Sequence, residues 1–289
     1  MPEPPRPAYL PAALLAQALD GRDAPLLLDA SYYLPSEPQD AEALYQAARL
    51  PGAQRFDLDA VADPFSTLPH MLPALPRLEA ALASWGWRPG QKIVLYDQKG
   101  LFSSPRAAWS LAEFGLETAV LIGGLPAWRE QGLPLETEGT APTVIPSPLP
   151  QLARRQTSVA SLDAVKMALS DGSAQVIDAR DALRFSGQAP EPRAGLRSGH
   201  MPGALNLPFT ELLSADKRDF RPLTALKAAF QKAGVDLSRP IITSCGSGIT
   251  AAILLEAALR AGAASVRLYD GSWAQWGDPR AATPVATGA

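Results

Sequence analysis

Thiols and imidazoles are scarce in this chain of 289 residues, which contains one cysteine and two histidines. A single cysteine, Cys245, excludes an internal disulfide, and it excludes a zinc site built from several thiolates. His70 and His200 are too few to supply most other metal sites. We therefore predict no metal site, and any thiol chemistry must pass through Cys245.

Long apolar runs and basic clusters are also missing. No stretch approaches the roughly 20 apolar residues that a membrane-spanning helix needs. The net charge is −3 and no basic run stands out, so we expect no nucleic acid as partner and no membrane. Residues 10–19 could be mistaken for a signal peptide, but their flank has no net positive charge and Pro11 interrupts them. The missing targeting signals predict a cytoplasmic protein.

The composition that remains is that of a globular protein, with 47% hydrophobic and 19% charged residues. The length allows two domains of ordinary size. The two halves match at an offset of about 150 residues, which indicates a duplicated domain rather than a short structural repeat. By this match, residues 10–19 are predicted to form the first helix of the first domain. The matching segments are 10–30 and 161–180, 49–58 and 200–209, 78–97 and 226–245, and 120–128 and 266–276.

Each half alternates short β-rich runs with helical stretches rich in Ala and Leu. Residues 26–28 and 93–95 in the first half, and 176–177 and 241–243 in the second, are expected to be buried parallel strands. This alternation predicts an α/β fold in which each half forms a mainly parallel sheet with helices on both faces.

Prolines mark the junction between the halves. Four of them interrupt the periodicity between positions 142 and 150. We therefore predict a first domain over residues 8–137, a linker over residues 138–156, and a second domain over residues 157–285.

The stretch around Cys245 is the most informative part of the sequence. A strand runs into Cys245, a loop from Gly246 to Thr250 follows, and a helix is expected from about Ala251. In α/β sheets, chemistry is placed outside the carboxyl ends of the strands. The glycines allow successive backbone N–H groups to turn inward, and the helix N-terminus adds its dipole. The loop therefore favours a thiolate or a persulfide anion at Cys245.

Two classes of enzyme use such an anion cradle. Cysteine phosphatases need an arginine six residues after the cysteine, because its guanidinium clamps the phosphate. That position is Ala251 here, so the phosphate clamp is missing. The shorter loop suits a sulfur atom instead.

The loop CGSGIT, residues 245–250, resembles the active-site loop of the 3-mercaptopyruvate sulfurtransferases, which have tandem rhodanese domains. The similarity covers nearly the whole chain and includes residues 198–209 (SGHMPGALNLPF) and 269–276 (YDGSWAQW). In the first half, Asp97 stands where the cysteine would be. The resemblance therefore implies a catalytically inactive rhodanese-like domain followed by a catalytic one.

The resemblance also implies roles outside the loop. Arg184 and Arg193 match the two arginines that bind the carboxylate and keto oxygen of the donor, and guanidinium forks suit a 2-oxo acid. Asp59 and His70 match residues that reach the catalytic cleft, where they would complete a Ser-His-Asp relay with Ser247. A structural role for His70 and a helix-capping role for Ser247 stay open. The implied catalytic residues are Cys245, Ser247, His70 and Asp59, and the implied substrate-binding residues are Arg184, Arg193, Gly246, Gly248, Ile249 and Thr250.

Four further residues near these motifs are assigned structural positions. His200 matches a histidine that fixes a loop in rhodanese domains. Trp273 and Trp276 are predicted to lie in the core. Arg197 matches no functional position and is predicted to lie on the surface.

The activity that the resemblance implies is a two-step sulfur transfer without a cofactor. Cys245 would take sulfur from 3-mercaptopyruvate, release pyruvate, and pass the sulfur to a thiol acceptor, such as thioredoxin or a small dithiol, or to cyanide. Two alternatives stay open. A thiosulfate:cyanide sulfurtransferase of the same fold is disfavoured by the neutral residues Gly246 and Ser247. A non-enzymatic persulfide carrier that docks on a partner is disfavoured by the presence of both arginines and Cys245.

Overall fold

The computed structural model describes residues 6–137, 144–155 and 158–288, which fall into two compact units. The units follow the two halves of the chain except for two short exchanged segments. Residues 66–71 belong to the second unit, and residues 215–219 belong to the first. The predicted linker lies partly outside the described residues, and its described part, 144–155, contains neither helix nor strand.

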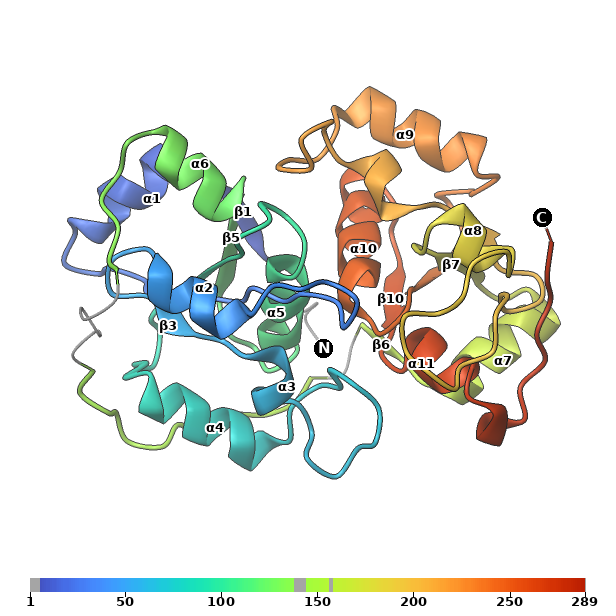
Figure 1. The fold of residues 1–289 in the computed structure, drawn as a ribbon, viewed down its shortest axis with the longest axis horizontal. Coiled ribbons are helices and arrows are strands. Elements are labelled where there is room, and N and C mark those ends of the chain that lie inside the picture. Colours follow the sequence, from blue (N-terminus) through green and yellow to red (C-terminus); the bar gives the residue numbers. More distant parts are fainter. Residues whose placement is uncertain (1–5, 138–143, 156–157, 289) are drawn as a thin grey trace. The chain divides into compact units, whose positions relative to one another are not determined.

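The first unit is built on a five-stranded sheet with the strand order β1-β5-β4-β2-β3, and every pairing in it is parallel. Figure 1 labels most of its elements. The strands are β1 (Ala8–Leu10), β2 (Leu26–Asp29), β3 (Gln54–Arg55), β4 (Ile93–Tyr96) and β5 (Thr118–Leu121). The helices are α1 (Ala12–Leu19), α2 (Ala41–Ala47), α3 (Leu58–Val61), α4 (Leu75–Ser84), α5 (Ser104–Ala112) and α6 (Gly124–Glu130).

The second unit repeats this arrangement, with the strand order β6-β10-β9-β7-β8 and parallel pairings throughout. The strands are β6 (Val159–Ala160), β7 (Gln175–Asp178), β8 (Leu205–Asn206), β9 (Ile241–Ser244) and β10 (Val266–Tyr269). The α-helices are α7 (Leu162–Asp171), α8 (Ala182–Phe185), α9 (Leu223–Lys232), α10 (Ile249–Ala261) and α11 (Ser272–Trp276), and the 3-10 helices are η1 (Phe209–Leu212) and η2 (Pro279–Ala281).

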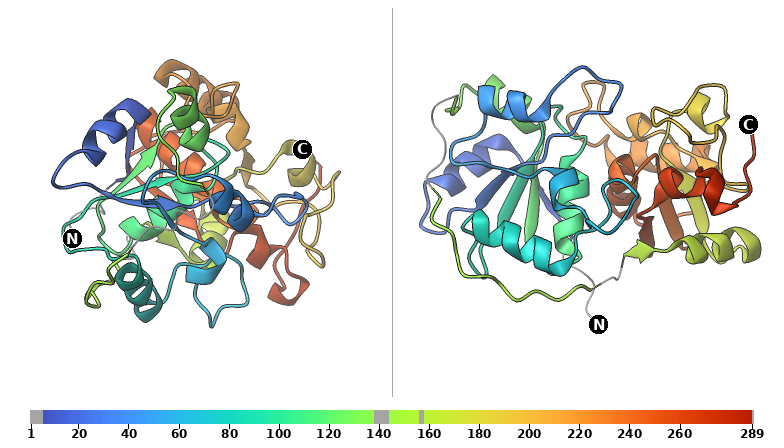
Figure 2. Two further views of the ribbon diagram at one scale, coloured as in Figure 1. Left: turned by 60° about the vertical axis from the view of Figure 1, so that its left-hand side comes forward. Right: turned by 60° about the horizontal axis from the view of Figure 1, so that its bottom comes forward.

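Helices lie on both faces of each sheet (Figure 2). In the second unit, Val165 of α7 and Trp273 of α11 pack with Val176 and Ile242 on one face. Helix α10 covers the other face against β9 and β10, and α9 packs on α10. Because both faces are covered, the central strands are buried along almost all of their length. The predicted α/β class and the internal duplication are confirmed.

The first predicted helix is wrong at its start. Leu10 lies in β1, where it is paired with Leu121, and α1 begins only at Ala12. Pro11 stands at the N-cap with an extended backbone, φ −73° and ψ 158°. Proline lacks the N–H group that a helix interior requires, so the helix starts just after it. Most of the apolar segment is nevertheless the first helix of this unit.

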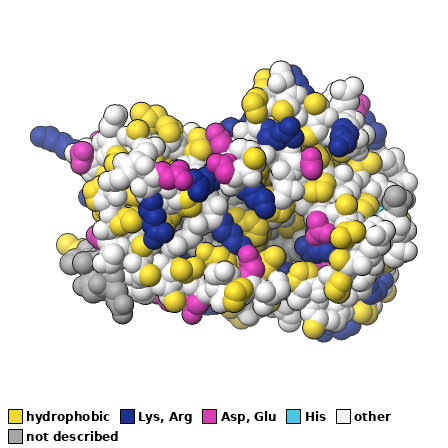
Figure 3. All heavy atoms as spheres, turned by 45° about the horizontal axis from the view of Figure 1, so that its top comes forward, with side chains coloured by type: hydrophobic (Ala, Val, Ile, Leu, Met, Phe, Trp, Pro, Cys, Tyr) yellow, Lys and Arg dark blue, Asp and Glu magenta, His cyan; other side chains and the backbone are white. Residues whose placement is uncertain are grey.

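The surface carries charges of both signs. On the face shown in Figure 3, basic and acidic side chains are interspersed with apolar ones. Within the described ranges, no helix is both long enough and apolar enough to cross a membrane.

Candidate active site

Cys245 directly follows β9, a central strand of the second unit, and only 2% of its surface is exposed. The backbone N–H of Gly248 donates a hydrogen bond to its Sγ at 3.1 Å. Gly248 is the N-cap of α10 and has a φ of +83°, a left-handed conformation that glycine adopts without strain. The sulfur therefore lies at a helix N-terminus, where the partial positive charge favours an anion.

Helix α10 begins two residues earlier than expected, at Ile249 rather than Ala251. Ile249 and Thr250 therefore belong to the first turn of the helix and not to the loop. Gly248 is the N-cap of α10. Ser247 is buried and stands one position before it. The loop proper is thus Cys245 to Gly248, and the backbone N–H of its last residue bonds the sulfur.

The first residues of α11 hold the cysteine loop in place. The Ser272 hydroxyl accepts the N–H of Cys245 at 3.2 Å and donates to the carbonyl of Tyr269 at 2.9 Å. The N–H groups of Trp273 and Ala274 donate to the carbonyls of Cys245 and Gly246 at 2.9 and 2.8 Å. Sequence reasoning missed Ser272, although the motif YDGSWAQW was a signal for it. These bonds fix the backbone on which the nucleophile is carried.

Arg184 lies against the cysteine loop. It sits on the short helix α8 after β7, and the carboxylate of Asp181 accepts its backbone N–H at 3.0 Å. A Cβ atom built on Gly246 would lie 3.0 Å from Arg184 Nη2. The guanidinium therefore borders the residue that follows the nucleophile, and glycine at position 246 leaves room for it.

A buried carboxylate pairs with that guanidinium. Glu191 accepts from Nη2 of Arg184 and from Nη1 of Arg180, each at 2.6 Å. Arg180 in turn pairs with Asp178 at 2.7 Å. Burial lowers the pKa of Arg180, but the charges of Asp178 and Glu191 outweigh this effect and raise it above its ordinary value. Sequence reasoning missed Arg180 and Glu191, because nothing local marks two residues of a buried ion network.

His70 and Arg193, both predicted site residues, meet in the second unit. Nη2 of Arg193 lies 2.9 Å from Nε2 of His70. Because a guanidinium can only donate, Nε2 is the acceptor in this contact and carries no proton. His70 is buried and has a φ of +58°, an uncommon backbone conformation for a side chain of this size.

Asp59 belongs to the other unit. It is an exposed residue in the first turn of α3, in the first unit, and its backbone N–H donates to the carboxylate of Asp57 at 2.8 Å. The relay of Asp59, His70 and Ser247 therefore stays a prediction.

The prediction that Arg197 lies on the surface is wrong. Its half-buried guanidinium donates to the carbonyls of Trp276 and Thr283 at 2.8 and 2.7 Å, and to the hydroxyl of Thr283 at 2.7 Å. It thus ties the segment after α11 to the segment that carries Arg193. His200 stacks on Phe185 and bonds its carbonyl at 2.9 Å, which agrees with a loop-fixing role. Trp273 and Trp276 lie in the core as predicted.

The family model for the rhodanese-like domain matches this chain twice, at residues 11–131 and 161–278. The chain belongs to the rhodanese family. Each match covers four of the five strands of one sheet, so the predicted tandem of rhodanese domains is confirmed.

Named relatives of this rhodanese are similar over most of its length. The 3-mercaptopyruvate sulfurtransferase of Escherichia coli K12 is 39% identical over 279 residues, which cover 96% of this chain and 97% of the relative. The mitochondrial thiosulfate/3-mercaptopyruvate sulfurtransferase 1 of Arabidopsis thaliana is 38% identical over 269 residues, which cover 86% of this chain and 71% of the relative. The crystal structure of SseA from Escherichia coli matches with a TM-score of 0.80 and 36% identity, over 92% of this chain and 99% of that one.

In the first rhodanese domain, Asp97 follows β4 as Cys245 follows β9, and it occupies the cradle itself. Its Oδ2 accepts the N–H groups of Phe102, Ser103 and Ser104 at 2.9, 3.1 and 3.0 Å. It also accepts the hydroxyl of Ser104 at 2.6 Å, and Oδ1 accepts the N–H of Lys99 at 3.0 Å. The amides at the start of α5 thus face a built-in carboxylate. The position that corresponds to Cys245 is thus held by a carboxyl side chain, and the inactivity of this domain stays a prediction.

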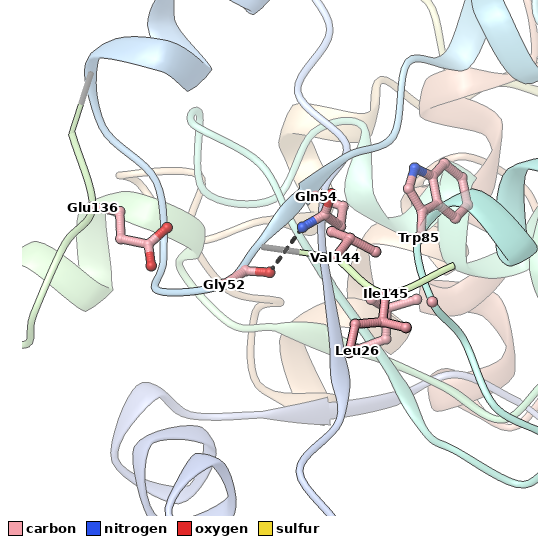
Figure 4. A pocket seen from close by; sticks show the side chains of 8 residues that line it. Leu26, Gly52, Gln54, Trp85, Glu136, Val144 and Ile145 are labelled. Carbon is pink, nitrogen blue, oxygen red and sulfur yellow. Dashed lines mark hydrogen bonds between the residues drawn. The ribbon is translucent and has the colours of Figure 1, made fainter. Parts of the chain in front are cut away.

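A separate pocket of about 330 Å³ lies in the first domain (Figure 4). Its polar groups include the carboxylate of Glu136, which pairs with Arg49 at 3.4 Å, and the amide of Gln54, which donates to the carbonyl of Gly52 at 3.3 Å. None of the predicted site residues lines it. The lining residues are Leu26, Gly52, Gln54, Trp85, Gly86, Glu136, Val144 and Ile145.

Proposed function

We propose that this rhodanese is a 3-mercaptopyruvate sulfurtransferase that carries sulfur as a persulfide on Cys245. The observation that carries the proposal is the guanidinium of Arg184, which borders Gly246 of the cysteine loop. The loop itself contains no cation, so Arg184 is the cation beside the nucleophile. A single guanidinium there suits a donor with one carboxylate and a keto group. The named relatives from Escherichia coli and Arabidopsis support the same substrate.

In the first half-reaction, Arg184 and Arg193 hold the carboxylate and keto oxygen of mercaptopyruvate. The thiolate of Cys245 attacks the donor's sulfur, so that an S–S bond forms while the C–S bond breaks. The electron pair of the C–S bond stays on carbon as the enolate of pyruvate. The proton of the donor's thiol ends on that carbon, which leaves pyruvate and a persulfide anion on Cys245.

Ser247 and His70 are the groups proposed to move this proton. Ser247 is two residues from the nucleophile, and His70 contacts Arg193, the second proposed donor-binding arginine. Asp59 would fix the tautomer of His70 in the relay. Gly246, Gly248, Ile249 and Thr250 are the loop residues proposed to bind the substrate, and the N–H of Gly248, which bonds Sγ at 3.1 Å, is a ready donor to the anion.

In the second half-reaction, an acceptor thiolate attacks the outer sulfur and regenerates the thiolate of Cys245. A dithiol acceptor then expels this sulfur as sulfide when its second thiol closes a disulfide. Thioredoxin and small dithiols have the two thiols that this step requires, and cyanide would take the sulfur directly. We propose a cytoplasmic location for this reaction, which cell fractionation tests.

One observation supports thiosulfate as a second candidate donor. The Arabidopsis relative is named for both thiosulfate and mercaptopyruvate. Steady-state kinetics with the two donors side by side decide between them. We expect kcat/KM to favour mercaptopyruvate strongly. A preference for thiosulfate would overturn the substrate assignment and leave sulfur transfer intact, whereas turnover with neither donor would favour a persulfide carrier.

A further inference from the structure

Glu191 is a carboxylate that the proposed reaction does not use. Its side chain is only 2% exposed, and each of its two oxygens lies 2.6 Å from a guanidinium nitrogen, one of Arg180 and one of Arg184. Glutamate is almost never buried to this degree unless it is paired. Glu191 thus links a buried arginine to a proposed substrate-binding arginine, and we ask what this link does for the second arginine.

Arg180 is the fixed end of this chain of contacts. Its side chain is 0% exposed, and its Nε and Nη2 donate to both oxygens of Asp178 at 2.7 to 3.2 Å. Nη2 also donates to the carbonyl of Gly199 at 2.9 Å, and the guanidinium stacks on Trp273 at 4.2 Å. Because Asp178 ends β7, Arg180 is tied to the sheet and leaves Nη1 for Glu191.

Arg184 is the adaptable end. Its side chain is 19% exposed, and the side-chain partner that the structure gives its guanidinium is Glu191. An arginine side chain has four rotatable bonds, so an exposed guanidinium would sample many positions. Glu191 selects the position in which Nη2 borders Gly246. The nitrogen that faces the cysteine loop is thus the one bonded to the carboxylate.

The same contacts balance charge. Arg180 and Arg184 contribute two positive charges, and Asp178 and Glu191 contribute two negative charges. The group therefore has no net charge, and Arg184 offers directed N–H donors without an excess positive field. A dianion such as thiosulfate gains most from excess positive charge, whereas a 2-oxo acid gains from the geometry of the donors.

We propose that Glu191 positions Arg184 against the cysteine loop and, by neutralising its charge, sets the preference for a 2-oxo acid over a dianionic donor. This inference rests on the proposed function. It makes Glu191 a positioning and specificity-determining residue, which acts through Arg184 and not on the sulfur.

Glu191→Gln tests the inference, because it keeps the shape of the side chain and removes its charge. We expect kcat/KM for mercaptopyruvate to fall about 10- to 100-fold, while kcat/KM for thiosulfate stays the same or rises. The donor ratio should therefore shift by at least about tenfold. Glu256→Gln is the matched control, because it removes a Glu–Arg pair of 2.8 Å two turns along α10 and should leave the ratio unchanged.

A double-mutant cycle separates positioning from a general loss of structure. In the background of Arg184→Ala, the further change Glu191→Gln should have little effect on mercaptopyruvate, because the residue through which it acts is gone. If Glu191→Gln does not fold, Glu191→Asp keeps the charge and shortens the reach, so it should lower kcat/KM for mercaptopyruvate while thiosulfate gains nothing.

Parallel losses for both donors in Glu191→Gln, or additive losses in the cycle, would overturn the inference. Those results leave a wild-type preference for mercaptopyruvate untouched, so they are distinct from a failure of the proposed function. That failure would show as a thiosulfate preference in the wild-type protein measured in the same assay.

Discussion

Nη2 of Arg193 lies 2.9 Å from Nε2 of His70, so the histidine proposed for proton relay also holds an arginine proposed to bind the donor. While Nε2 accepts this hydrogen bond, it has no proton to give from the same nitrogen. The contact therefore makes the fixing of Arg193 the main task that we expect of His70.

Two variants of His70 separate these tasks. His70→Ala removes the acceptor, and we expect it to raise KM for mercaptopyruvate roughly tenfold. His70→Gln places an amide oxygen where it can accept the same bond, and it should restore most of the affinity. Melting temperatures recorded for both variants exclude a loss of folding as the cause. If kcat fell equally in both variants while KM stayed the same, proton relay would be the main role.

Loss of either arginine should reduce activity with mercaptopyruvate more than activity with thiosulfate. Replacing Arg184 or Arg193 by Ala should cost about 2–4 kcal/mol of transition-state stabilisation with mercaptopyruvate. The loss with thiosulfate should be much smaller, because that donor has no keto group to hold. Lysine should rescue only in part, since it keeps the charge and loses the planar fork. Equal losses for both donors would mean that the arginines organise the fold or the general field.

The Asp97 carboxylate should stabilise the first domain without serving the reaction. Asp97→Asn turns one acceptor oxygen into an NH₂ group that faces backbone N–H donors, so we expect a loss of about 1–3 kcal/mol in unfolding free energy. Asp20→Asn, a change at an exposed aspartate of the same unit, is the control. Thermal unfolding and the activity of the folded protein report the two effects. An unchanged melting temperature would show that the loop amides do not depend on this anion.

How much the sequence predicts depends on how local the interactions are. Cys245, its glycines and α10 are contiguous, so strand, loop and helix could be placed within two residues. Leu10 was misplaced because its strand pairing depends on Leu121, more than a hundred positions away. Arg197 was misjudged for the same reason, since its partner carbonyls lie 79 and 86 positions further on.

Contacts within the buried charge network are a second kind that the sequence does not predict. Glu191 lies between Arg184 and Arg193 in the sequence, yet its pairing with both Arg180 and Arg184 depends on how this segment folds back on α8. Ser272 could be found only as part of a motif, because its bond to the N–H of Cys245 spans 27 positions. Residue type alone gives no signal for either contact.

The most direct test of the account is the intact mass of the protein after incubation with mercaptopyruvate and no acceptor. Cys245 is the only thiol in the chain, so the account predicts a gain of one sulfur atom in the wild-type protein, and its loss when a dithiol is added. Cys245→Ser should show neither the added sulfur nor turnover. A wild-type protein that releases pyruvate at its full rate but never gains the sulfur would contradict the persulfide mechanism.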